Sequence, residues 1–88
     1  MRFDYDPAKA AANLRKHKVS FADAEGVLQD PLAVTVEDSG SAGERRFAGI
    51  GLGSAGELLV VVYAERQSAY RLISARRPMR KERKQYEG

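Results

Sequence analysis

The feature that most constrains the fold is a pair of β-rich runs in the second half of the chain. Leu58–Tyr63 is the only long apolar run, and Tyr70–Arg76 alternates between polar and apolar residues. Four polar residues, Glu65–Ser68, stand between the two runs. Two such runs with a short polar gap predict an antiparallel β-hairpin. The first run is apolar at odd and even positions alike, which is typical of a central strand covered on both faces.

Strand alternation divides the second run into two sets that point to opposite faces of the sheet: Tyr70, Leu72 and Ser74, and Arg71, Ile73 and Ala75. An arginine inside a half-buried strand is held more rigidly than one in a loop, so Arg71 is a candidate for binding an anion. Beyond Arg76-Arg77-Pro78 the chain continues into a basic segment, Met79–Tyr86. These residues predict an anionic partner at this end of the hairpin.

Length and composition narrow the class of protein. With 88 residues the chain forms one domain, residues 1–88. It has no cysteine and one histidine, so we expect no disulfide framework, no metal site and no cofactor. Residues 1–7 carry acidic side chains and a proline where a signal peptide has an apolar block, and no apolar run is long enough to cross a membrane. We therefore expect a soluble cytoplasmic protein without membrane contact.

Charge is distributed unevenly along the chain around a net value of +3. Residues 1–20 hold five basic and two acidic side chains, residues 21–65 hold two basic and eight acidic, and residues 66–88 hold eight basic and two acidic. This asymmetry indicates a basic face for a polyanion and an acidic region elsewhere. The alternative is a basic C-terminal tail that only aids solubility, and charge considered alone favours that alternative.

Capping and turn signals delimit the other elements. Asp6-Pro7 is typical of a helix start, because Asp accepts a backbone N–H as N-cap and Pro suits the first helical position. Ser20 is a second N-cap, and Asp30-Pro31 ends the helix that it starts. Besides the hairpin we expect a short edge strand at 3–5, helices at 9–16 and from 20 to 30, strands at 32–36 and 44–52, a loop at 37–43 and a helix after residue 78. This order predicts an α+β fold: an antiparallel sheet of about four to five strands with an N-terminal helical hairpin and a C-terminal helix.

Several motifs follow one another along the chain: Phe3-x-Tyr5-Asp6-Pro7-x-Lys9-x-x-x-Asn13-x-x-Lys16-His17-x-Val19-Ser20-Phe21, Asp30-Pro31, Glu44-Arg45, Ile50-Gly51, Leu58–Tyr63, Arg71-x-Ile73-Ser74-Ala75-Arg76 and Glu82-Arg83-x-x-Tyr86. This ordered set resembles the BrnT-type toxins over nearly the whole chain. The resemblance implies a RelE-like fold and a toxin of a type II toxin–antitoxin module that cleaves RNA. It also implies an antitoxin with a ribbon-helix-helix DNA-binding region. The toxin would contact operator DNA only through this antitoxin. Lys18 departs from the pattern, which has glycine after the histidine.

RNA cleavage needs no metal if side chains move protons and stabilise charge. A ribose 2′-hydroxyl attacks the adjacent phosphate when a base removes its proton, cations stabilise the added negative charge, and an acid protonates the leaving oxygen. His17 is the candidate for proton transfer, since histidine exchanges protons near neutral pH. The phosphate-stabilising candidates are, in order, Arg71, Arg45 and Arg76, because guanidinium forks match phosphate oxygens. Lys16 completes the catalytic set. The alternatives are an idle histidine at a helix C-terminus and strand arginines held in ion pairs.

Further basic residues are candidates for contact with RNA. Lys9 shares a helix face with Lys16, and the alternative for these two lysines is a solvated helix face. Arg80 and Arg83 lie in the basic C-terminal segment. Tyr86 either stacks on a base or docks the last helix.

Together these residues predict a metal-independent endoribonuclease toxin that inhibits translation and is neutralised by its antitoxin. The alternative is a non-catalytic RNA- or ribosome-binding module. We expect the antitoxin to face the basic C-terminal block, and an exposed edge strand near Leu32–Val36 could also pair with it.

Overall fold

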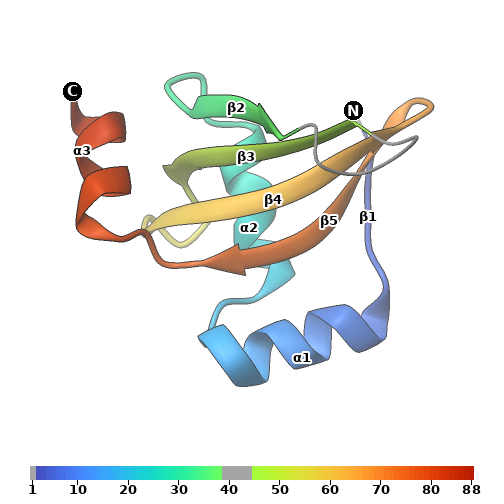
Figure 1. The fold of residues 1–88 in the computed structure, drawn as a ribbon. Coiled ribbons are helices and arrows are strands. Elements are labelled where there is room, and N and C mark those ends of the chain that lie inside the picture. The colour runs from blue at the N-terminus through green and yellow to red at the C-terminus, as the bar shows by residue number, and fades with distance from the viewer. Residues whose placement is uncertain (1, 39–44) are drawn as a thin grey trace.

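The computed structural model describes residues 2–38 and 45–88, which form three helices and five strands (Figure 1). In chain order the elements are β1 (Arg2–Asp4), α1 (Pro7–His17), α2 (Phe21–Leu28), β2 (Val34–Asp38), β3 (Arg45–Leu52), β4 (Leu58–Arg66), β5 (Ala69–Arg76) and α3 (Arg80–Glu87). The predicted α+β class and the order of the elements are confirmed. The strand expected at 32–36 begins and ends two residues later, and the remainder of the loop expected at 37–43 lies outside the described residues.

The five strands form one sheet in the order β1-β5-β4-β3-β2. The β4–β5 hairpin predicted from the apolar run is present, with β4 in the centre of the sheet. Neighbouring strands are antiparallel except for β1, which pairs with β5 in parallel through only three residues, Arg2–Asp4. The sheet is therefore mainly antiparallel, and most of the outer edge of β5 has no strand beside it within residues 2–38 and 45–88.

The two N-terminal helices begin where the capping signals predict. Asp6 caps α1 by accepting a hydrogen bond from the N–H of Ala8, and Ser20 caps α2 by accepting one from the N–H of Asp23. At the other end of α1, Lys18 adopts a left-handed conformation with φ of 60° and ψ of 32°. Lysine here takes the backbone conformation that glycine adopts at least cost.

The larger hydrophobic core lies on one face of the sheet, which we call the helical face because α2 packs against it (Figure 1). Its buried members are Val19, Phe21, Ala24, Val27, Leu59, Val61, Tyr63, Leu72 and Ala75. Phe21, Ala24 and Val27 on one side of α2 are buried in this core. None of the helices in the described part of the chain is both long and apolar enough to span a membrane.

We call the opposite side of the sheet the open face. Ile50, Leu58 and Val60 form a smaller buried cluster, and the ring of Tyr86 from α3 packs against it. Residues of β4 alternate between the two faces, so the same strand contributes to both cores. The expectation of a central strand covered on both faces is therefore confirmed for the part of β4 near α3.

β5 does not alternate regularly along its length. Val62 of β4 pairs with Ser74, and the next β4 residue, Tyr63, pairs with Leu72. Ile73 is therefore one extra residue on β5, a β-bulge that interrupts the ladder. The prediction of strict alternation through this strand is wrong beyond Leu72, because an extra residue exchanges the faces to which all later side chains point.

The bulge has two consequences for the side chains that follow it. Ala75 joins the core of the helical face, where the regular pattern placed it on the opposite side. Arg71 and Arg76, which are five residues apart, pair with Ala64 and Val60 of β4, and these two are four residues apart. Both arginines therefore point to the open face. In a regular strand, two residues five apart would point to opposite faces.

Candidate active site

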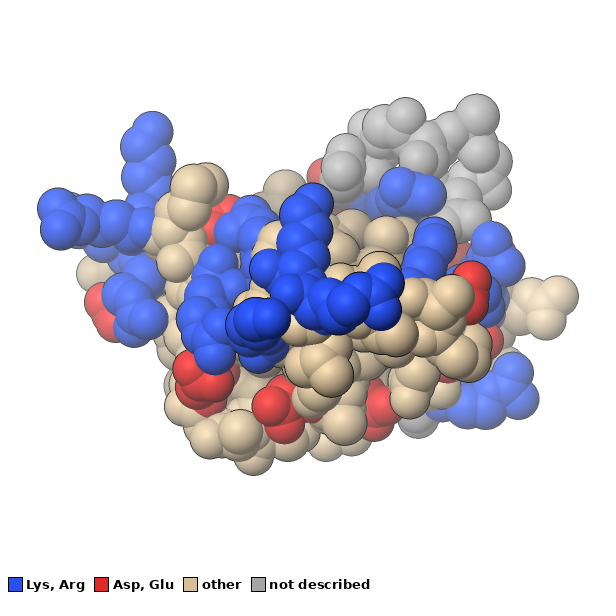
Figure 2. All heavy atoms as spheres, turned by 90° about the horizontal axis from the view of Figure 1, so that it is seen from below, with Lys and Arg blue, Asp and Glu red and all other residues tan. Residues whose placement is uncertain are grey.

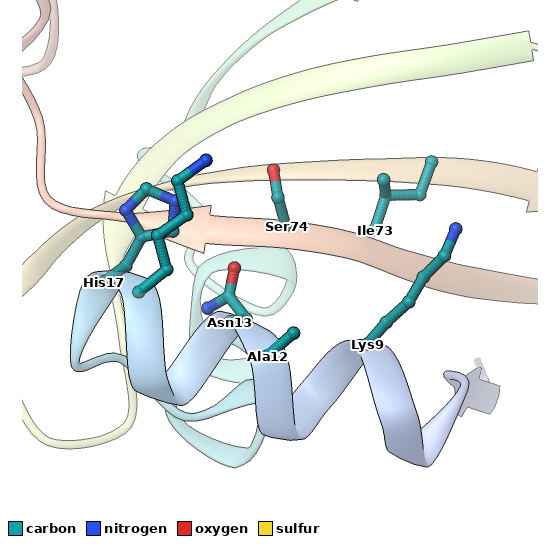
Figure 3. A pocket seen from close by; sticks show the side chains of 7 residues that line it. Lys9, Ala12, Asn13, His17, Ile73 and Ser74 are labelled. Atoms are coloured by element: carbon teal, nitrogen blue, oxygen red, sulfur yellow. The ribbon is translucent and has the colours of Figure 1, made fainter.

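A groove of about 300 Å³ lies between α1 and the outer edge of β5. Its lining residues are Lys9, Ala12, Asn13, Lys16, His17, Ile73 and Ser74. The side chains of Lys9 and His17 rise from α1 towards β5 at opposite ends of the groove, and those of Ile73 and Ser74 stand on the strand between them (Figure 3). The groove therefore joins a helix from the start of the chain to a strand near its end.

Asn13 holds α1 against the strand edge. Its side chain is buried, with 6% of its surface exposed. Nδ2 donates to the carbonyl of Ala75 at 2.8 Å, and Oδ1 accepts from the N–H of Ala75 at 3.0 Å. Nδ2 also donates to the carbonyl of Val19 at 3.0 Å. The amide thus takes the place of a neighbouring strand, satisfying backbone groups that a bare edge would leave unpaired.

Lys9 and Lys16 share one face of α1 with Asn13, as the helical spacing predicts. Lys9 and Lys16 lie four residues before and three residues after Asn13, so the three side chains share one face of α1. The two lysines are exposed and separated by seven residues, roughly 10 Å along the helix axis. None of the described residues that line the groove is acidic, so the groove attracts anions.

His17 closes the groove at the C-terminal end of α1. The side chain is half-buried, and the carbonyl of the same residue accepts a hydrogen bond from Nη1 of Arg77 at 3.1 Å. Arg77 also forms an ion pair with Glu57 at 3.3 Å, which connects the end of α1 to the turn before β4.

Arg71 lies close to the groove in sequence but does not line it. Its Nη1 donates to Oδ1 of Asp4 at 3.1 Å, and one third of the side chain, 33%, is exposed. The contact joins β5 to β1 where the two strands pair. Arg71 therefore sits on the open face, two residues before Ile73, with part of its side chain exposed.

Arg76 anchors the last helix. Its two terminal nitrogens each donate to a carboxylate oxygen of Glu82 at 2.8 Å. Glu82 also accepts a hydrogen bond from the N–H of Met79 at 2.8 Å. The Arg76 hydrogen bonds, against some desolvation by burial, lower the pKa of Glu82 to about 2. This pair orients the start of α3 relative to β5.

Arg45 lies at the other end of the sheet from His17. It pairs across strands with Glu65, close to the β4–β5 turn. Ala75, which contacts Asn13 near His17, pairs with Val61, four residues from Glu65 along β4. The guanidinium contacts Glu37 at 3.2 Å and Glu65 at 3.5 Å, and it lies 5.3 Å from the ring centroid of Phe47. Hydrogen bonding to Arg45 lowers the pKa of Glu37. The structure does not bring Arg45 and His17 together.

Tyr86 docks α3 onto the sheet. Its hydroxyl donates to Oδ2 of Asp30 at 2.7 Å, and its ring covers the small cluster of the open face. Asp30 also accepts from the N–H groups of Leu52 and Leu32, and these bonds, with that of Leu52 the largest contribution, lower the pKa of Asp30. The alternative role for Tyr86, a residue that docks the last helix, accounts for these contacts.

Arg80 and Arg83 are exposed on α3. Figure 2, which views the molecule from below, shows Lys and Arg side chains across this side, from α3 at the left to the region of α1. The basic residues predicted to contact RNA therefore belong to two separate elements, α1 and α3.

Four of the seven lining residues were not predicted as site components: Ala12, Asn13, Ile73 and Ser74. Asn13, Ile73 and Ser74 occur in the motifs, but no role was predicted for them. The position of Asn13 between Lys9 and Lys16 on one helix face was an available signal. Within residues 2–38 and 45–88, no group of three His, Cys, Asp or Glu side chains is placed to hold a metal ion.

Comparisons with known proteins agree with this architecture. The crystal structure of the ribonuclease toxin BrnT of Brucella abortus is similar over 91% of this chain and 99% of that chain, with a TM-score of 0.66 and 25% identity. No protein with curated annotation matches the chain. Residues 5–82 match the family of the ribonuclease toxin BrnT of type II toxin–antitoxin systems. Because this match covers most of the chain, the protein belongs to the BrnT family of ribonuclease toxins of type II toxin–antitoxin systems.

Proposed function

We propose that this toxin is a metal-independent endoribonuclease that cuts RNA in the groove between α1 and β5. The observation that carries the proposal is the composition of the groove: a histidine, two lysines and a serine converge there, and no acidic residue lines it among those described. Such a groove attracts the phosphate backbone, and its histidine is a residue type suited to proton transfer.

The proposed chemistry follows from the ribose. The 2′-hydroxyl loses its proton, its oxygen bonds to the adjacent phosphorus, and the 5′-oxygen leaves with a proton, which yields a 2′,3′-cyclic phosphate and a 5′-hydroxyl. His17 transfers a proton in this reaction. Lys16 stabilises the charge that develops on the phosphate, and the Ser74 hydroxyl donates a hydrogen bond to a phosphate oxygen. Lys9, at the other end of the groove, holds a neighbouring phosphate.

The three candidate arginines take different roles in this proposal. Arg71 contacts the RNA backbone from the open face, where part of its guanidinium is exposed beside the groove. Arg76 acts indirectly, because its pair with Glu82 sets the position of α3 and of the cations Arg80 and Arg83. Arg45, held between Glu37 and Glu65 at the far end of the sheet, contributes to the strands and not to the reaction.

The cellular setting follows from the proposed activity. Cleavage of cytoplasmic messenger RNA inhibits translation, and a cognate ribbon-helix-helix antitoxin neutralises the toxin. The toxin then reaches operator DNA only through that antitoxin.

Purified toxin and a defined single-stranded RNA test the proposal directly. Incubation with excess EDTA is followed by analysis of the RNA ends. We expect cleavage that leaves a cyclic phosphate and a 5′-hydroxyl. Cleavage that requires added Mg²⁺ would overturn metal independence. Tight RNA binding without any cleavage would identify the protein as a binding module in place of an enzyme.

A further inference from the structure

An aliphatic surface lies at the edge of the sheet opposite to the groove. β2 is the last strand of the sheet and pairs only with β3 among the described strands. Leu32, Val36 and Leu52 are exposed by 72%, 59% and 43% of their surface. With Val34 they form what we call the β2 surface. Large apolar side chains exposed beside an unpaired strand edge are typical of a site that another chain covers.

The β2 surface is held in place by Asp30. Its two carboxylate oxygens accept hydrogen bonds from the N–H groups of Leu32 at 2.9 Å and Leu52 at 2.8 Å, so the two leucines flank one carboxylate. Val34 pairs with Ile50, and alternation then directs Val34, Val36 and Leu52 to the open face. The apolar strip is therefore ordered before any partner binds, which reduces the entropy lost on binding.

A basic helix adjoins this strip. The Tyr86 hydroxyl donates to the same Asp30 carboxylate, so α3 lies next to Leu32 and Leu52. The helix carries four exposed basic residues: Arg80, Lys81, Arg83 and Lys84. One of them, Arg83, has an acidic neighbour in Glu87 at 3.6 Å. A partner that covers the β2 surface thus meets a cluster of positive charge at one end of it.

We propose that the β2 surface binds the antitoxin through an extended segment that pairs with the free edge of β2. The apolar side chains of that segment cover Val34 and Val36, and its acidic residues reach α3. Main-chain hydrogen bonds to an edge strand supply affinity, and side chains on one face supply specificity. The opposite charge on α3 selects an acidic partner and speeds association.

RNA does not fit this surface. Its four members have no cation, hydrogen-bond donor or aromatic ring in their side chains, and nucleic-acid sites rely on such groups. The proposal rests on the antitoxin that the toxin–antitoxin family implies, and it is independent of the cleavage chemistry proposed for the groove.

The test measures the affinity of the antitoxin for variants of the full-length toxin. Val36→Glu places a charge at the centre of the apolar strip and should weaken binding at least about 30-fold. Leu14→Glu is the matched control, because Leu14 is a leucine of 50% exposure on α1, on another element of the fold. The control should bind like the wild type. The double variant Arg80→Glu with Lys81→Glu should bind more weakly, with the largest loss at low salt.

Hydrogen exchange gives a second measurement that does not depend on a substitution. The amides of β2 should exchange more slowly in the wild-type complex than in the free toxin, while α1 amides should change less. RNA cleavage by free Val36→Glu reports whether that variant folds, since β3 and β4 separate β2 from the groove. If Val36→Glu fails to fold, Val36→Thr keeps the shape of the side chain and makes it polar.

Wild-type affinity in a folded Val36→Glu toxin, with no protection of β2, would overturn the proposal. A free toxin that dimerises through β2, with unchanged antitoxin affinity in Val36→Glu, would assign the surface to a second copy of this chain and overturn it as well. A toxin that binds antitoxin through β2 but cuts no RNA would refute the proposed cleavage and leave this surface assignment standing.

Discussion

The side chain of Asn13 forms hydrogen bonds with both backbone groups of Ala75, a residue 62 positions later in the chain. β1 pairs with β5 only as far as Arg71, so none of the described strands lies beside the edge of β5 beyond that point. The Asn13 amide supplies the missing donor and acceptor, and α1 lies along the edge at a distance that leaves the groove open. The candidate site therefore exists because a helix side chain substitutes for a sixth strand.

Replacement of Asn13 by Asp should destabilise the protein. Asp has no N–H to donate, so the buried carbonyls of Val19 and Ala75 lose their partner, at a cost of about 2–4 kcal/mol in the free energy of unfolding. Urea unfolding measures the loss. Gln29→Glu makes the same chemical change at an exposed position and should shift stability by less than about 0.5 kcal/mol. An Asn13→Asp protein as stable as the wild type would contradict the role assigned to this amide.

Substitution of His17 should impair cleavage without unfolding the protein. His17→Ala removes the group that we assign to proton transfer, and the single-turnover rate should fall by about 10²–10⁴. Arg45→Ala is the comparison, since Arg45 lies at the far end of the sheet and its loss should leave the rate nearly unchanged. Thermal melting establishes that both variants are folded. If Arg45→Ala is as impaired as His17→Ala, the site extends beyond the groove.

Lys18→Gly should stabilise the protein. Lys18 has φ of 60°, where glycine avoids the steric cost that a side chain meets, and the gain exceeds the added entropy of the unfolded chain by about 0.5–1 kcal/mol. Denaturant unfolding measures the change. Gln67→Gly, at φ of 50° in the β4–β5 turn, should shift stability in the same direction. A loss of stability in both variants would show that the two side chains make contacts worth more than the strain.

Acid should weaken the attachment of α3. The pKa of Glu82 falls from 4.5 to about 2 in the folded protein, mainly through hydrogen bonds from Arg76. Because the folded pKa is the lower one, the pair stabilises the folded state above pH 4.5, and this contribution is lost as pH falls from 4.5 towards 2. Asp30 acts with the same sign, since its pKa is also lowered.

The comparison of wild type with Glu82→Gln isolates this contribution. Wild-type stability should decrease more between about pH 6 and about pH 3 than that of the variant, because the variant has no carboxylate to protonate at this position. Urea unfolding at the two pH values measures both decreases. Glu87→Gln, in the same helix and paired with Arg83 at 3.6 Å, serves as the control and should behave like the wild type. Equal decreases in all three proteins would rule out the Arg76–Glu82 pair as the acid-sensitive contact.

Interactions between neighbours in the chain made much of the fold predictable. Helix starts at Asp6 and Ser20 follow from side chains that bond to backbone groups two or three residues later. The buried strand at Leu58–Tyr63 follows from its continuous apolar character, since such a segment has to be covered on both faces. The shared face of Lys9 and Lys16 follows from the period of the helix. Each of these features depends on a few adjacent residues, so the sequence by itself determined them.

Features that depend on residues far apart in the chain were decided only by the tertiary structure. The bulge at Ile73 arises from how β5 aligns with β4, and no residue type in β5 marks it. It places Arg71 and Arg76 on one face, although their spacing in a regular strand puts them on opposite faces. Packing of α1 against β5 then brings Ser74 to Lys16 and His17, while strand pairing carries Arg45 to the opposite end of the sheet. Residue types identified the candidate cations, but the distances between them depend on how separate elements pack, and local patterns carry no information about that.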